Sequence, residues 1–147
     1  MIRLATKEDT PHILSLCLNF FNASSFSSAS EFNEDHVTNF ISGVLDKPLT
    51  EGVVLLAYRE KPIGILASLK TQLMFSGEDV SCELVWWVEP EYRRSRDGLE
   101  LLSAYEYWAK HVAKVSKIQV SNLTPEVEKI YRKRGYVPQE TAWIKGI

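Results

Sequence analysis

The middle of the chain contains three consecutive apolar segments, each typical of a β-strand. They are GVVLLAY (52–58), IGILASLKTQL (63–73) and VSCELVWWV (80–88), and turn-like residues separate them. Short connections of this kind join antiparallel neighbours, because a parallel pair needs a long crossover. The pattern therefore predicts a three-stranded antiparallel meander at the centre of the fold.

Helical and strand-like patterns flank the meander on both sides. In chain order, we expect a strand at 2–5, helices at about 11–21 and 33–47, the meander, a helix at 98–111, a strand at 117–121, a helix at 124–134 ended by Gly135, and strands near 136–137 and 142–145. The fold class is then α/β (α+β), with a mixed, mostly antiparallel central sheet of six to seven strands flanked by about four helices. No linker divides the chain, so we expect one domain over 1–147.

Composition narrows the classes of function. The chain has 147 residues and a net charge of −2, from 17 basic and 19 acidic residues, which does not favour nucleic-acid binding. Cys17 and Cys82 lack metal-ligand spacing, and the three histidines are far apart in sequence, so we expect no metal. The N-terminus has no continuous apolar segment, which argues against a signal peptide or a membrane span and favours the cytoplasm.

The stretch EPEYRRSRDGLELL (89–102) follows the last strand of the meander and leads into a helix. The first turn of a helix has free N–H groups and the positive end of the dipole, so it attracts anions. Gly98 allows close backbone approach, and Arg93, Arg94 and Arg96 add positive charge. This arrangement suits a phosphate or diphosphate, although a surface turn can also carry arginines without any ligand.

Four segments together resemble the GCN5-related N-acetyltransferase (GNAT) family. They are IRLATKEDTPHILSL, the meander, VEPEYRRSRDGLELL and IYRKRGYVP, and phrases such as ELVWWVEPEYR are similar to family members carried by bacteriophages and bacteria. In that family an Arg/Gln-x-x-Gly-x-Gly/Ala turn binds the diphosphate of coenzyme A (CoA). Arg93 matches its first position and Gly98 its last, whereas Arg96 replaces the middle glycine. The arginine can point outward if residue 96 has an ordinary backbone conformation.

The resemblance implies acetyl-CoA as co-substrate and no metal. The expected CoA-binding residues are Val88, Arg93, Arg94, Ser95, Arg96, Asp97, Gly98, Leu99 and Asn122. Asn122 could instead cap the following helix, and basic residues near 129–134 could reach the 3′-phosphate or form a solvated helix face. A β-bulge often accompanies the splayed strand that receives the CoA arm, and it would change which side chains face the cleft.

The resemblance also implies acetyl transfer by direct attack within a ternary complex. Tyr131 matches the family tyrosine that faces the sulfur, so it is the expected acid, while the alternative is a core aromatic. Glu83 is the expected base, because a carboxylate in the apolar run CELVWWV would have a raised pKa if buried. Glu83 could also face solvent, and Glu89 is a lesser candidate. Trp86 and Trp87 should face opposite sides of their strand.

The serine-rich stretch 22–33 is expected to be a mobile connection beside the acceptor. Glu31, Glu34 and Asp35 would favour a cationic acceptor amine, on a small molecule or on a protein lysine or N-terminus. We expect no nucleic-acid or membrane partner, and a homodimer is one expectation for the assembly. The alternative function is a CoA-binding or protein-interaction module without turnover, for which Arg96 is the main argument.

Overall fold

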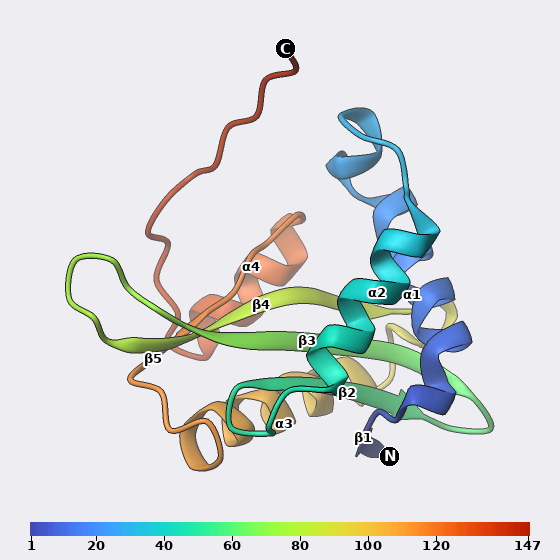
Figure 1. The fold of residues 1–147 in the computed structure, drawn as a ribbon, viewed down its shortest axis with the longest axis horizontal. Helices are drawn as coiled ribbons and strands as arrows, with labels where there is room; N and C mark the ends of the chain where they lie inside the picture. The colour runs from blue at the N-terminus through green and yellow to red at the C-terminus, as the bar shows by residue number, and fades with distance from the viewer.

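The computed structural model describes residues 1–147, and it contains one five-stranded sheet with helices on both faces (Figure 1). The strands are β1 (Ile2–Leu4), β2 (Gly52–Tyr58), β3 (Pro62–Gln72), β4 (Asp79–Val88) and β5 (Lys117–Gln119). The helices are α1 (Thr10–Ala23), α2 (Glu34–Leu45), α3 (Asp97–His111) and α4 (Pro125–Lys133), with short 3-10 turns at Lys7–Asp9 (η1), Ser25–Ser28 (η2) and Pro90–Tyr92 (η3).

The sheet order is β1-β2-β3-β4-β5, and strands β1 to β4 pair with one another antiparallel. Strand β5 pairs with β4 in parallel. The predicted meander, the mixed sheet and the four flanking helices are therefore confirmed. The predicted count of six to seven strands is wrong, since the sheet has five.

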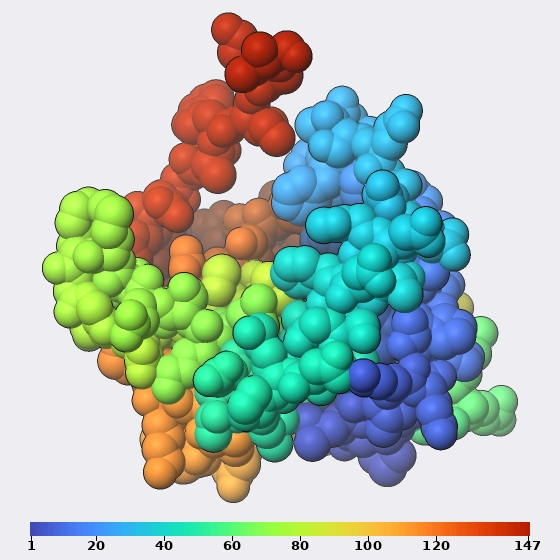
Figure 2. Space-filling view, viewed as in Figure 1, coloured from blue at the N-terminus to red at the C-terminus, as the bar shows by residue number.

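The difference in strand number comes from the C-terminal segment. Strands were expected near residues 136–137 and 142–145, but no strand follows β5. Tyr136 still packs on the core, and residues 137–147 leave the body of the molecule as an irregular chain (Figures 1 and 2). Trp143 and Ile144 are 92% and 79% exposed. Their apolar pattern suits a strand, but a strand is stable only with a partner, and a local pattern does not specify one.

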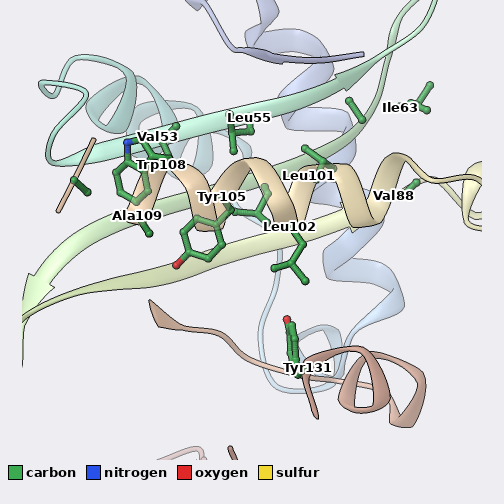
Figure 3. Packing of buried hydrophobic residues seen from close by; sticks show 13 residues of the cluster. Val53, Leu55, Ile63, Val88, Leu101, Leu102, Tyr105, Trp108, Ala109 and Tyr131 are labelled. Carbon is green, nitrogen blue, oxygen red and sulfur yellow. The ribbon is translucent and has the colours of Figure 1, made fainter. Parts of the chain in front are cut away.

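Two separate cores lie on the two faces of the sheet. Helices α1 and α2 cover one face, where Ile13, Leu16 and Ile41 pack against residues of β2, β3 and β4. Helix α3 covers the other face, and Leu101, Leu102 and other residues of that helix pack on the sheet there together with Tyr131 from α4 (Figure 3). Strands β2 and β3 are buried on both faces, which explains their continuous apolar runs.

A β-bulge in β4 decides which of its side chains face which helices. Ala67 lies opposite Val85, whereas Ser68 lies opposite Glu83, so Leu84 is the extra residue. Leu84 and Val85 both pack on the α1–α2 side. Trp86 faces α3, so strict alternation of side chains along β4 would put Glu83, three residues earlier, on the α1–α2 side. The bulge instead turns Glu83 toward α3 and α4.

Local signals set the helix starts. The Thr6 amide donates to Asp9 (2.8 Å), and Pro11 occupies the first turn of α1. The Asn33 side chain caps α2 by accepting from the His36 amide (2.9 Å). The stretch expected to be a mobile connection is more regular than predicted, because α1 continues to Ala23 and η2 follows it. None of the helices combines the length and apolarity that crossing a membrane requires.

Candidate active site

The turn between β4 and α3 presents backbone N–H groups that have no acceptor within the protein. The amides of Arg94, Arg96, Gly98 and Leu99 donate to no backbone or side-chain atom, whereas those of Arg93 and Ser95 are used within the turn. We call the four free amides the amide cradle. Free amides at a helix N-terminus fit an anionic group such as a diphosphate.

Arg96 does not distort this turn. Its backbone angles, φ −83° and ψ −9°, are those of an ordinary helical residue, and its side chain is exposed. The condition for an outward-pointing arginine is therefore met. Arg93 and Arg94 are also exposed, but the Arg93 guanidinium lies 4.3 Å from the centre of the Trp87 ring. Arg96 and Arg94 form no ion pair, so their charge is available to a ligand.

A buried carboxylate lies at the start of the same helix. Asp97 accepts hydrogen bonds from the Ser95 hydroxyl and from Arg59 (2.9 Å), which comes from the β2–β3 turn. These hydrogen bonds, that of Ser95 first, hold the pKa of Asp97 below its usual value despite its burial. Arg59 is half exposed and also lies over the Tyr92 ring. It therefore offsets a negative charge that would otherwise oppose an anion at the cradle.

Strands β4 and β5 diverge after a short pairing. They pair only from Val80 to Cys82, so the rest of β4 has no neighbour on that edge. The Glu89 amide donates to the Ile63 carbonyl (2.9 Å). By antiparallel alternation, the backbone N–H and C=O groups of Trp86 and Val88 therefore point away from β3, into the gap between β4 and β5.

This open edge of β4 fits a peptide-like arm such as that of CoA. The Val88 carbonyl already accepts a hydrogen bond from Arg93 Nε (3.0 Å), which leaves the Val88 N–H and the backbone groups of Trp86 for a ligand. A ligand arm that pairs with β4 would thus compete with Arg93 at one atom.

Glu83 lies at the point where the two strands diverge. Its carboxylate accepts a hydrogen bond from the Ser121 amide (3.0 Å), just beyond β5. Burial raises the pKa of Glu83 to about 7, and the Ser121 hydrogen bond acts in the opposite direction. The expected rise in pKa is confirmed, so this carboxylate can take up a proton near neutral pH.

Tyr131 approaches the same place from α4. Its hydroxyl donates to the Ser121 carbonyl (2.9 Å), and its ring centre lies 5.8 Å from that of Trp86. Burial and the nearby Glu83 charge raise its pKa, so the hydroxyl keeps its proton. Tyr131 is only 7% exposed and belongs to the α3-side core (Figure 3). Its position therefore fits both expectations: a core aromatic, and a hydroxyl that keeps its proton beside the gap between β4 and β5.

Sequence reasoning missed Ser121 and Arg59. Ser121 joins Glu83 to Tyr131 through its backbone, which no side-chain pattern reveals. Arg59 reaches Asp97 from 38 residues away, and an acidic residue among the arginines before α3 was the only local hint. These contacts depend on tertiary structure.

Several other predicted binding residues have defined positions. Asn122 is exposed and does not cap α4, whose N-cap is Thr124, so the capping alternative is wrong. Arg134 pairs with Glu106 (2.6 Å) and Arg132 with Glu128 (2.7 Å). On the basic helix face, this leaves Lys129 and Lys133, which are exposed and form no ion pair, for a 3′-phosphate.

The acidic residues expected near the acceptor line a shallow pocket of their own. It is formed by residues 31–35 at the start of α2, and it includes Glu31, Glu34 and Asp35. Phe32 also contributes and packs on Phe21, with 5.5 Å between ring centres. Neither Glu83 nor Tyr131 lines this pocket.

No family model matches the sequence, and no curated protein matches it. Solved structures do match it along its full length. An acetyltransferase of Trypanosoma brucei is 14% identical with a TM-score of 0.74, and the match covers 100% of this chain and 99% of that chain. The chain has the fold of known acetyltransferases. The predicted resemblance to GNAT enzymes is thereby confirmed at the level of the fold.

Two further structures with this fold carry more specific names. An aminoglycoside antibiotic 6′-N-acetyltransferase of Acinetobacter haemolyticus is 19% identical, with a TM-score of 0.73 and coverage of 100% of this chain and 97% of that chain. A ribosomal-protein-alanine N-acetyltransferase of Brucella melitensis is 13% identical, with a TM-score of 0.70 and coverage of 100% and 99%. Their acceptors differ, so the shared fold does not specify one.

Proposed function

We propose that this protein is an acetyl-CoA-dependent N-acetyltransferase that acts on a primary amine. The observation that carries the proposal is the arrangement along β4. The amide cradle lies at one end of the open edge, and Glu83 and Tyr131 meet at Ser121 at the other. An anion site and a proton-accepting and proton-donating pair, joined by free strand backbone, are the parts that acetyl transfer from a thioester requires.

The residues of the chain have distinct roles in this proposal. The amide cradle and the exposed Arg94 and Arg96 hold the diphosphate, and the β4 backbone at Trp86 and Val88 positions the arm. Acetyl-CoA supplies the activated acyl group. Glu83 accepts the proton of the acceptor amine, directly or through water, and Tyr131 gives its proton to the departing sulfur. A C–N bond forms as the C–S bond breaks, and proton exchange with water restores both residues.

The acceptor is a cationic amine in this proposal. Glu31, Glu34 and Asp35 place three carboxylates on the pocket at the start of α2, which attracts positive charge. Two of the similar structures are named for an aminoglycoside and for a ribosomal-protein alanine, respectively. Both a polycationic small molecule and a protein amine are therefore candidates.

Thiol release from acetyl-CoA in the presence of an amine panel tests the proposal. The panel contains an aminoglycoside, a polyamine, a lysine peptide, a free N-terminal peptide and an uncharged aliphatic amine. We expect amine-dependent release with a preference for the cationic acceptors. Binding of CoA without release for any amine would support a binding module instead, and a preference for the uncharged amine would contradict the role of the acidic pocket.

A further inference from the structure

Strand β4 carries two adjacent tryptophans whose indole N–H groups are buried without an acceptor. Trp86 Nε1 and Trp87 Nε1 are the only buried side-chain polar atoms in residues 1–147 that lack a hydrogen-bond partner. Buried donors in native proteins nearly always have an acceptor, so an exception calls for a reason. The two residues point to opposite faces of the sheet, so each has its own surroundings.

Trp86 lies between the amide cradle and Tyr131. A β-carbon on Gly98 would lie 3.9 Å from Trp86 Cζ2, and that ring carbon is bonded to the carbon that carries Nε1. The other neighbour is the Tyr131 ring, 5.8 Å away between centres. The edge of the ring that carries the N–H therefore lies near Gly98, and the same ring adjoins Tyr131.

Trp87 has different surroundings. Its ring packs edge-on against Phe20 of α1, with 6.2 Å between centres, and carries the Arg93 guanidinium on its face. It faces the α1–α2 core, on the side of the sheet opposite Tyr131. Trp87 thus also has a buried indole N–H without an acceptor, but its ring does not adjoin Gly98.

We propose that the Trp86 indole N–H donates a hydrogen bond to an oxygen of bound CoA, on the arm that runs from the cradle toward Tyr131. This inference rests on the proposed function. Both the diphosphate and the amide carbonyls of the arm offer oxygen acceptors, and either would satisfy a donor that the protein leaves unpaired. Trp86 is then a binding residue that favours the loaded state, because its hydrogen bond exists only there.

The chain has four tryptophans, so ¹⁵N-labelled protein gives four indole N–H signals, and loss of a signal in Trp86→Phe or Trp87→Phe assigns it. On titration with CoA we expect the Trp86 signal to move downfield by more than that of Trp87, which the ligand affects only by displacing Arg93. ADP, which has the diphosphate without the pantetheine arm, locates the acceptor. A Trp86 shift with ADP assigns it to the diphosphate, and a shift with CoA alone assigns it to a carbonyl of the arm.

A variant that removes only the donor gives the second measurement. Benzothienylalanine replaces the indole N–H by sulfur in a ring of nearly the same shape, so its introduction at position 86 preserves packing. We expect CoA affinity to fall about 5-fold, the loss of one neutral hydrogen bond. Thermal stability should not fall, because the N–H has no partner in the free protein. The same replacement at Trp87 is the matched control and should leave CoA affinity unchanged.

The outcomes separate this inference from the function on which it rests. If the wild-type protein binds CoA while the Trp86 signal stays in place and the replacement at 86 has no effect on affinity, the inference is wrong and the proposed function stands. If the wild-type protein binds no CoA at all, both are overturned.

Discussion

Glu83 and Tyr131 both form hydrogen bonds with the backbone of Ser121. The Glu83 carboxylate accepts from the Ser121 N–H, and the Tyr131 hydroxyl donates to the Ser121 carbonyl. One group is from β4 and the other from α4, and the β4 bulge at Leu84 is what turns Glu83 to this side. The arrangement places a carboxylate with a pKa near neutrality beside a hydroxyl that retains its proton, where β4 and β5 diverge.

Tyr131→Phe separates catalysis from binding. Loss of a general acid should lower kcat roughly 100-fold, while CoA affinity stays within about 2-fold. The variant should also lose about 1 kcal/mol of unfolding free energy, because the Ser121 carbonyl loses its donor. Steady-state kinetics, calorimetry and urea unfolding give the three values.

Tyr136→Phe is the matched control for that variant. Tyr136 packs on Tyr131, with 5.3 Å between ring centres, but its hydroxyl donates to Glu106. The Tyr136→Phe variant should have a lower free energy of unfolding than the wild type and an unchanged kcat. Full activity in Tyr131→Phe would remove the proton-donating role of Tyr131.

Glu83→Gln tests the raised pKa through stability. Between the ordinary carboxyl pKa, about 4.3, and about 7, the folded state holds a proton on Glu83 that the unfolded chain has lost, so the wild-type free energy of unfolding should fall as pH rises across this window. Glu83→Gln should remove this part of the pH dependence. The variant should therefore match the wild type near pH 4 and be more stable at pH 8, as measured by urea unfolding at several pH values.

The same variant tests the role of Glu83 as a base. Wild-type kcat/KM should rise with pH through about 7, and Glu83→Gln should lower it and abolish that rise. Glu89→Gln is the control, since Glu89 lies just beyond β4 and accepts a hydrogen bond from Asn19 (2.7 Å). An unchanged pH–rate profile in Glu83→Gln would assign the base to another group.

Arg59→Ala should lower both the free energy of unfolding and the affinity for CoA. Without Arg59, the buried negative charge of Asp97 faces the cradle with only Ser95 to offset it. We expect a loss of about 1–2 kcal/mol in unfolding free energy, less than for a fully buried pair because Arg59 is half exposed. Asp97→Asn in the same background should restore part of the CoA affinity. A double-mutant cycle measured by urea unfolding gives the coupling of Arg59 and Asp97 in stability, and the same cycle measured by calorimetry gives their coupling in CoA binding. Strictly additive effects would show that the two residues act independently.

Arg96→Gly introduces the residue expected from the motif, yet it should not improve binding. Residue 96 already has a helical backbone, so glycine adds only flexibility and removes a positive charge. CoA affinity should fall about 3-fold at low salt and less at high salt, because the charge is exposed. Arg96→Gln, which removes the charge without adding flexibility, should behave similarly in calorimetry. Tighter binding by Arg96→Gly would show that the side chain obstructs the cradle.

Local sequence signals predicted much of the fold. Strand β2 was predicted at its observed bounds, 52–58, because turn residues and a dense apolar run mark both ends. The spacing of apolar residues similarly marked α2, and Gly135, which has a positive φ, marked the end of α4. The C-terminal strands were wrong because residues 142–145 have a strand-like pattern without a partner.

The candidate site was predictable only in part. Glu83 was found because a carboxylate in an apolar strand is costly, and residues 93–99 were found from the helix start and the motif. The connection through Ser121 and the offset of Asp97 by Arg59 could not be predicted, since both join residues 38 positions apart. The bulge that places Glu83 beside Tyr131 also depends on strand pairing and leaves no clear local signal.

Backbone NMR of ¹⁵N-labelled protein during a CoA titration tests the central claim most directly. We predict that the amide signals of Arg94, Arg96, Gly98 and Leu99 move downfield together as CoA saturates the protein, whereas amides already bonded within the turn, such as that of Ser95, move little. If CoA at saturating concentration leaves the four signals unchanged, the cradle does not hold the diphosphate and the proposed acetyltransferase activity loses its basis.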